Sequence, residues 1–206
     1  MKKILLLVFI IFSFSCFSQD FEKGDKLFGG SFSISVFSLN NSGPSYYNTG
    51  NVGVLPSYSW FIKSNLALGI RGNISYSRVA TLQLSPDKRT TTSFAFGPSI
   101  FFKKYKPLKK KFGIYFDNSI GVNYSIDKEK TSSQPDYLKS HSFGATYHFS
   151  PGVFYRFSKK FIGEGNIGGV YASYYSNGNN DSFGIGASFL QYFNLGVNYV
   201  IGKNKG

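Results

Sequence analysis

Three residues of this sequence are of the types that carry out hydrolysis. His148 and Ser150 stand two positions apart, and Glu164 follows 14 positions after the serine. A histidine, a serine and a glutamate can act as base, nucleophile and orienting carboxylate when their side chains lie within hydrogen-bond reach of one another. Whether these three meet depends on the elements that carry them.

The stretch 52–77 shows what those elements are. Apolar residues such as Val52, Val54 and Trp60 alternate with small or polar ones, and the alternation resumes after residues 63–65. A period of two in β-branched and aromatic residues predicts an extended strand, and two such runs joined by a short turn predict an antiparallel hairpin. Each arm has about ten residues or more, the length with which a tilted strand crosses a bilayer core.

The same alternation recurs along the chain, together with an internal repeat. A proline followed by an aromatic pair and a lysine-bearing turn occurs at Pro56, Pro98 and Pro151. Three such hairpins, flanked by a first and a last strand, predict an all-β fold, an eight-stranded antiparallel up-and-down transmembrane β-barrel. The strands are expected near residues 28–36, 52–62, 66–77, 93–102, 112–124, 143–157, 161–174 and 183–199, with longer polar loops at 39–51, 79–90, 127–140 and 176–182.

The charged residues decide between a soluble barrel and a membrane barrel. A membrane barrel turns its apolar parity to lipid and encloses a polar lumen, whereas a soluble barrel does the reverse. The polar parity of the expected strands is mainly Gly, Ser, Asn and Thr, while a water-facing surface would carry many Lys and Glu. We therefore expect lipid outside and a narrow polar lumen. The charged residues on the polar parity are Arg71, Asp117, Arg156 and Glu164.

These four charges predict a plugged lumen. The interior of an eight-stranded barrel is just wide enough for side chains to fill it, and buried charges need partners. Arg71 and Asp117 stand at comparable depths in their strands, and Arg156 and Glu164 fall nearly opposite each other across the third hairpin. We expect paired lumenal charges and no wide pore.

The same register separates the hydrolytic residues. Glu164 is expected near Arg156, about eight residues or roughly 27 Å along the strand from His148. The sequence also has no phosphate-cradling glycine loop, zinc-ligand spacing or dinucleotide fingerprint, and its two histidines, His141 and His148, lack clustered carboxylates. We therefore expect no enzymatic activity, no catalytic or metal-binding residue and no cofactor.

The amino terminus has the pattern of a secretory signal peptide. A basic start, an apolar run over 4–12 and small residues before Gln19 predict a cleaved signal at 1–18 and one barrel domain at 19–206. After the signal there is no apolar run of about 18 residues, so a membrane-spanning mature chain would have to be a closed barrel.

Cys16 is the single cysteine of the sequence. A lipoprotein acylation site would be one interpretation, but Ser13 stands where such a motif has an aliphatic residue. We expect Cys16 to be discarded with the signal peptide.

Orientation follows from the lengths of the connections. Outer-membrane barrels keep short turns in the periplasm and longer loops outside. The lysine-bearing turns at 63–65, 103–111 and 158–160 lie on the side of both termini, so both termini are expected to be periplasmic. Aromatic residues flanking these turns predict an interfacial aromatic girdle, namely Trp60, Phe61, Tyr105, Phe112, Phe157 and Phe161.

The run 103–111 holds six lysines in a chain of net charge +13. Three interpretations are open: nucleic-acid binding, attraction to anionic lipid headgroups, and a solvated turn. At the end of a membrane hairpin, attraction to headgroups is simpler than nucleic-acid binding. Because charge runs are usually solvated, we favour the solvated turn over both, and we expect no nucleic-acid partner.

The hairpin 56–69, with PSYSWF before its turn and NLALG after it, and the SYS at 75–77 resemble the outer-membrane β-barrel domain family common in Bacteroidota. Those proteins are similar to small OmpX- and OmpA-type barrels. The resemblance implies location in the cell outer membrane and this architecture, and it transfers no active site.

We therefore expect an integral outer-membrane protein with a structural or surface-interaction role carried by its exterior loops. The alternatives are a narrow channel for small solutes, a soluble ligand-binding barrel, and a lipid-modifying enzyme, because His148, Ser150 and Glu164 resemble the arrangement in outer-membrane lipid A deacylases. The expected partners are outer-membrane lipid and, for insertion, periplasmic chaperones and the barrel-assembly machinery, while an extracellular partner is left open.

Overall fold

A computed structural model of the chain describes residues 21–40, 46–82, 88–132, 134–178 and 180–202. The expected signal peptide at 1–18, with Cys16, lies outside the described residues. Within them, no helix is long and apolar enough to cross a membrane.

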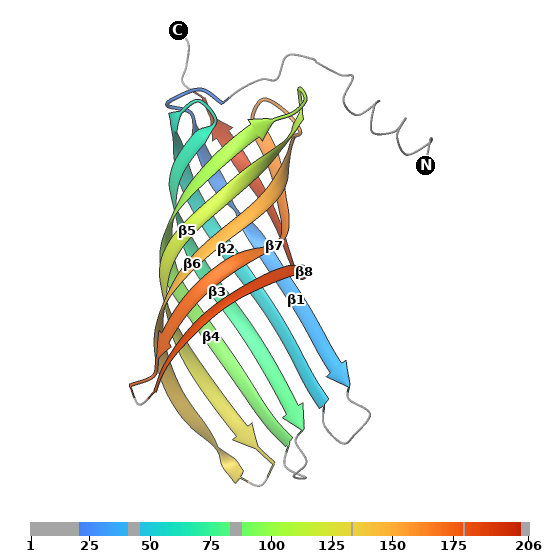
Figure 1. The fold of residues 1–206 in the computed structure, drawn as a ribbon, viewed down its shortest axis with the longest axis vertical. Helices are drawn as coiled ribbons and strands as arrows, with labels where there is room; N and C mark the ends of the chain where they lie inside the picture. The colour runs from blue at the N-terminus through green and yellow to red at the C-terminus, as the bar shows by residue number, and fades with distance from the viewer. Residues whose placement is uncertain (1–20, 41–45, 83–87, 133, 179, 203–206) are drawn as a thin grey trace.

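The described residues form an antiparallel sheet that closes on itself (Figure 1). Each strand pairs with its neighbours in sequence, and the first strand pairs with the last. The prediction of an all-β antiparallel fold is confirmed. The strands are β1 (Lys26–Asn40), β2 (Tyr46–Lys63), β3 (Leu66–Leu82), β4 (Lys88–Pro107), β5 (Phe112–Thr131), β6 (Gln134–Arg156), β7 (Phe161–Ser176) and β8 (Asp181–Ile201).

The strands run further than the sequence pattern predicted. The expected loop at 127–140 is mostly ladder, with Asp127 paired to Ser140, and β4 continues to Pro107 through most of the expected turn at 103–111. Backbone groups make the ladder, so pairing continues through polar residues after the apolar alternation has ended. The expectation of four long loops at one end was therefore wrong in its boundaries.

The pairing between β1 and β8 that closes the barrel is limited to the first part of β1. The two strands pair from Lys26 with Ile201 to Ile34 with Phe193, whereas β1 pairs with β2 as far as Asn40. Beyond that point β7 and β8 bend away from β1 (Figure 1). Nine paired positions, or eight steps at the usual rise and tilt, span about 21 Å along the barrel axis, close to the height of an outer-membrane apolar band.

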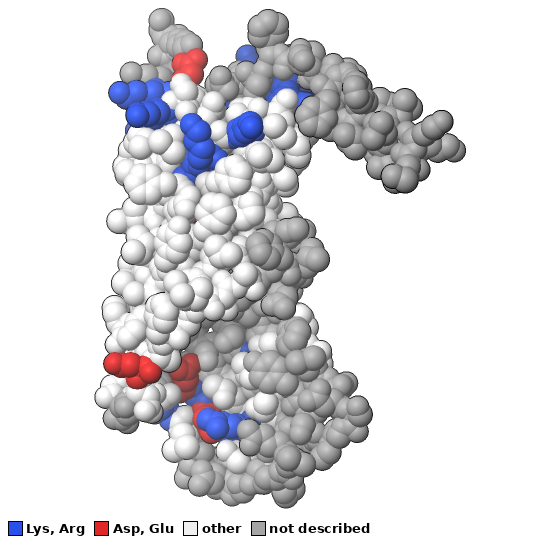
Figure 2. Space-filling view, in the orientation of Figure 1, with Lys and Arg blue, Asp and Glu red and all other residues white. Residues whose placement is uncertain are grey.

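Most of the large apolar side chains point away from the barrel axis. On β4, Phe94, Phe96, Ile100 and Phe102 are about half exposed, while the alternate residue Phe101 is buried. Figure 2 shows an uncharged belt on this face, with Lys and Arg gathered where β1 begins and charges of both signs at the opposite end. The barrel is therefore apolar outside.

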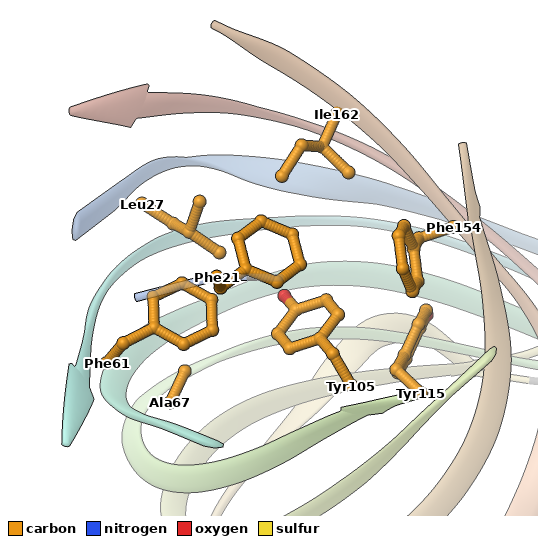
Figure 3. Close-up of a cluster of buried hydrophobic side chains, with 8 residues drawn as sticks. All are labelled: Phe21, Leu27, Phe61, Ala67, Tyr105, Tyr115, Phe154 and Ile162. Carbon is orange, nitrogen blue, oxygen red and sulfur yellow. The ribbon is translucent and has the colours of Figure 1, made fainter. Parts of the chain in front are cut away.

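The buried core lies inside the barrel near the end where β1 begins (Figure 3). We call this group the aromatic cluster, since five of its members are aromatic. The remaining lumen is lined by small and polar residues, among them Ser59, Ser119 and Ser150. The aromatic cluster consists of Phe21, Leu27, Phe61, Ala67, Tyr105, Tyr115, Phe154 and Ile162.

Candidate functional site

Charged side chains from four strands meet in the lumen beside the aromatic cluster. Arg71 on β3 lies with its Nη2 2.5 Å from Oδ2 of Asp117 on β5. Lys103 on β4 lies 3.7 Å from the same carboxylate oxygen and 2.6 Å from Oε2 of Glu164 on β7. The four side chains are at most 15% exposed. We call this group the ionic layer.

Neighbouring aromatic rings complete the ionic layer. The hydroxyl of Tyr105 donates a hydrogen bond of 2.5 Å to Oε1 of Glu164, so both oxygens of that carboxylate are engaged. The Arg71 guanidinium lies 4.5 Å from the centroid of the Phe101 ring, and Nζ of Lys103 lies 4.8 Å from that of Tyr115. Cations over ring faces are attracted by the ring quadrupole, so the layer ties the charges to the aromatic cluster.

The structure brings together some of the charges selected from the sequence. Arg71 and Asp117 form an ion pair. Arg156 is also buried, but it faces Ile162 across the β6–β7 ladder, whereas Glu164 faces Phe154. The Arg156 guanidinium lies 4.4 Å from the centroid of the Phe21 ring. Arg156 and Glu164 thus lie two ladder positions apart, nearly opposite each other as expected, and Glu164 contacts Lys103 and Tyr105.

The expected aromatic girdle divides into two groups. Trp60, Phe112, Phe157 and Phe161 point outward with 36%, 38%, 59% and 45% of their surface exposed. Phe61 and Tyr105 are 1% exposed and belong to the aromatic cluster, so their assignment to the girdle was wrong. Successive side chains of a strand point to opposite faces. Phe61 directly follows the outward-facing Trp60, and Tyr105 directly follows the outward-facing Lys104, so both rings point into the lumen.

Sequence reasoning missed Lys103. It was assigned to a basic turn, yet it lies on β4 with its side chain only 8% exposed. The sequence does contain the information that Lys103 points inward. Ser99 and Phe101 lie on the inward face of β4, and continuing the alternation by two residues places Lys103 on the same face. It was missed because a lysine next to other lysines suggested a turn. The buried carboxylates that pair with it, those of Asp117 and Glu164, lie far away in the sequence.

Phe21 was also missed, since it falls in a short charged segment before the first strand. Its ring stacks on Phe61, with centroids 4.6 Å apart and planes 9° apart, and lies 4.8 Å from Tyr105. The backbone is held as well, because the Phe21 N–H donates to Oδ1 of Asn65 and the Asn65 N–H donates to the Phe21 carbonyl. Phe21 therefore packs inside this end of the barrel. Figure 3 shows its ring among the cluster members.

The three hydrolytic residue types do not assemble. Ser150 is buried, and its Oγ donates a 2.8 Å hydrogen bond to the carbonyl of Gly168. His148 faces Tyr171 across the β6–β7 ladder, whereas Glu164 faces Phe154. Six residues of strand, about 20 Å, separate the two ladder positions. Among the described residues, no group of three or more His, Cys, Asp or Glu could hold a metal ion.

No protein-family model and no curated protein matches the sequence. Solved structures with similar folds include the outer membrane protein OprG from Pseudomonas aeruginosa, at 12% identity over 88% of this chain and 98% of that chain, with a TM-score of 0.47. Ail, the attachment invasion locus protein of Yersinia pestis, is similar at 12% identity over 87% of this chain and 99% of that chain, with a TM-score of 0.40.

Proposed function

We propose that this chain is an integral protein of the bacterial outer membrane that spans the bilayer as a β-barrel and has no enzymatic activity. The observation that carries the proposal is the reversed polarity of the wall. Phenylalanine, isoleucine and valine side chains cover the outside, and ionised groups lie inside. Water outside the wall would leave this apolar surface without a partner, whereas lipid matches it.

The height of the apolar surface supports a membrane-spanning position. On β4, the outward residues are apolar from Phe94 to Phe102 and are bounded by Thr92 and Lys104. Eight steps of tilted strand rise about 21 Å, comparable with the roughly 25 Å apolar band of outer-membrane barrels. The band therefore has the dimensions of a bilayer core.

The ends of the barrel suggest its orientation. The turn 108–111 and the turn 157–160 share one end with the start of β1 and the end of β8, and exposed lysines gather there. By the rule that short turns are periplasmic, this end faces the periplasm. The opposite end, where β5 and β6 extend to Thr131 and Gln134, then projects outside the cell.

We infer that side chains fill the lumen, which favours a structural or surface-interaction role over solute transport. The aromatic cluster and the ionic layer occupy successive levels of the lumen and contact each other through Tyr105. Such packing would plug a barrel of this size, because the interior of an eight-stranded barrel is just wide enough for the inward-facing side chains to fill it. The exterior connections are then the segments free to bind a partner, since loops on a rigid scaffold are the usual sites of binding.

One fractionation experiment tests the membrane proposal. The full chain would be expressed in a Gram-negative host, and its outer-membrane fraction would be run on a gel with and without boiling. We expect the protein in that fraction, extracted only by detergent, with faster migration when unboiled. Recovery in the soluble periplasm without detergent would contradict the proposal.

Planar-bilayer recordings test the plug separately. A lumen filled as described predicts no stable unitary current from the purified protein, while a narrow channel predicts discrete steps. A steady unitary conductance would show that the channel alternative is correct without affecting the membrane proposal.

A further inference from the structure

The outer wall carries a groove halfway up its apolar surface. The groove has a volume of about 680 Å³ and crosses β2, β3 and β4. Its floor consists of Pro56, Gly72 and Pro98, and among the larger residues that border it are Tyr58, Ile70 and Phe96. We call it the mid-wall groove.

The mid-wall groove results from three short residues in one row. Gly72 is paired with Pro98 across the β3–β4 ladder. On the other side, a Cβ added to Gly72 would lie 3.4 Å from Cγ of Pro56. On each strand these residues stand at outward positions with larger apolar residues two positions before and after them. The outer surface is therefore depressed along this row, and the depression has room for a straight apolar chain.

Two lysines stand on the same wall toward the end where β1 begins. Lys104 and Lys106 are exposed on β4, on the parity of Pro98. Six residues of tilted strand separate Lys104 from Pro98, which is about 16 Å along the barrel axis and matches half the thickness of a bilayer core.

The ladder partners of these lysines are uncharged. The Cα partners of Lys104 are Leu66 on β3 and Phe116 on β5, and that of Lys106 on β5 is Ile114. Asp117 on β5 and Glu164 on β7 face the lumen, and the other acidic residues described at this end, Glu22 and Asp25, come before β1. An anion approaching the wall at this level therefore meets uncompensated positive charge.

We propose that the mid-wall groove and Lys104 with Lys106 form one binding site for an anionic phospholipid of the periplasmic leaflet. The phosphate lies at the two lysines, and one acyl chain runs down β4 into the groove. This site rests on the proposed membrane insertion. A second copy of the chain fits the surface less well, because a symmetric pair in one membrane would bring the lysines of both copies together.

The single tryptophan of the chain makes the site measurable. Trp60 lies on the outer surface of β2, with its ring centroid 6.2 Å from that of Tyr58, a groove residue. The full chain would be reconstituted into phosphatidylcholine vesicles with a small fraction of phosphatidylglycerol. Bromine would be placed on the acyl chains of either lipid, at equal mole fraction in the two samples, and quenching of Trp60 would be recorded.

We expect brominated phosphatidylglycerol to quench Trp60 more strongly than the same fraction of brominated phosphatidylcholine. Attraction of an anionic lipid by one surface lysine corresponds to about a fivefold change in affinity, so Lys104→Gln with Lys106→Gln should lower the preference by more than tenfold. The matched control removes two exposed lysines from the turn 157–160, Lys159→Gln with Lys160→Gln, and should leave the preference almost unchanged.

A second pair of variants tests the groove itself. Gly72→Leu fills the floor with a side chain and should weaken quenching by phosphatidylglycerol. Gly50→Leu makes the same addition on β2, outside the groove lining and where an added Cβ meets no atom within 4 Å, and should not weaken it. Equal quenching by the two lipids in the native chain, or equal effects of the two lysine pairs, would overturn the site while leaving membrane insertion intact. Absence of quenching by either lipid would overturn both.

Discussion

Lys103 and Glu164 are 61 residues apart in the sequence, yet Nζ of the lysine lies 2.6 Å from Oε2 of the glutamate inside the barrel. Both side chains are almost fully buried. The contact joins β4 to β7, which are not neighbours in the sheet, so it crosses the lumen. Charges held in this way are stable only while each has its partner.

Removal of the cation should therefore destabilise the barrel. Lys103→Met keeps most of the side-chain volume but leaves Glu164 with Tyr105 as its remaining hydrogen-bond donor. Loss of one partner from a buried ion pair costs about 3–5 kcal/mol. We expect a decrease of that size in the free energy of unfolding, measured by urea titration of the vesicle-reconstituted protein.

The control for this variant is the adjacent lysine. Lys104→Met changes an exposed residue on the opposite parity of the same strand, and its effect should be below about 0.5 kcal/mol. The double variant Lys103→Met with Glu164→Gln removes both charges and should recover part of the loss. Equal stability of the Lys103 and Lys104 variants would contradict the assignment of Lys103 to a buried ion pair.

An exposed ion pair near the opposite end of the barrel should behave differently. Arg89 on β4 contacts Glu129 on β5, and 56% of the arginine side chain is exposed. Surface pairs contribute about 0–1 kcal/mol because water and salt screen them. We expect Arg89→Ala to leave the urea midpoint almost unchanged, and a loss as large as that of Lys103→Met would contradict this contrast between lumen and surface.

The sequence was enough to predict which residues face outward and which face inward in the wall of the barrel, because side chains alternate between the two faces of a strand. The alternation around Pro56 and Pro98 gave the outward positions directly, and it placed Arg71 and Asp117 on the inner face. The ends of the strands could not be predicted in this way. Ladder pairing continues through polar residues such as Asp127 and Ser140, where the apolar pattern stops.

The contents of the lumen could be predicted only in part. Parity shows that a side chain points inward, but it does not show which of several inward residues will touch. Glu164 contacts Lys103 because the closure of the sheet brings β4 opposite β7. Phe21 lies outside the alternating pattern altogether, so its position among the aromatic residues depends on tertiary packing.

Close packing inside the wall predicts a difference between two glycines. A Cβ added to Gly97 would lie 1.9 Å from the carbonyl oxygen of Val122, whereas one added to Gly50 would have no atom within 4 Å. Overpacking of this kind costs about 1–3 kcal/mol. We expect Gly97→Ala to lower the free energy of unfolding by that amount and Gly50→Ala to leave it unchanged or slightly raised, so a reversed order would contradict the packing described here.

The aromatic ring that closes the barrel should contribute more to stability than an equally large ring on the outside. Phe21 is 1% exposed and touches three other rings of the aromatic cluster, while Phe161 stands on the outer surface. Truncation of a buried phenylalanine to alanine costs about 3–5 kcal/mol, because a cavity is left behind. We expect a loss of that order for Phe21→Ala.

The matched variant Phe161→Ala removes a ring that lipid can replace, so its cost should be clearly smaller. Phe21→Leu, which refills most of the space, should recover more than half of the loss. Limited proteolysis gives a second measurement, because the segment 21–25 is held by bonds between Gly24 or Asp25 and Phe61 and should become cleavable when the ring is removed. If Phe21→Ala and Phe161→Ala lower stability equally and the segment stays protected, Phe21 does not close the barrel in solution.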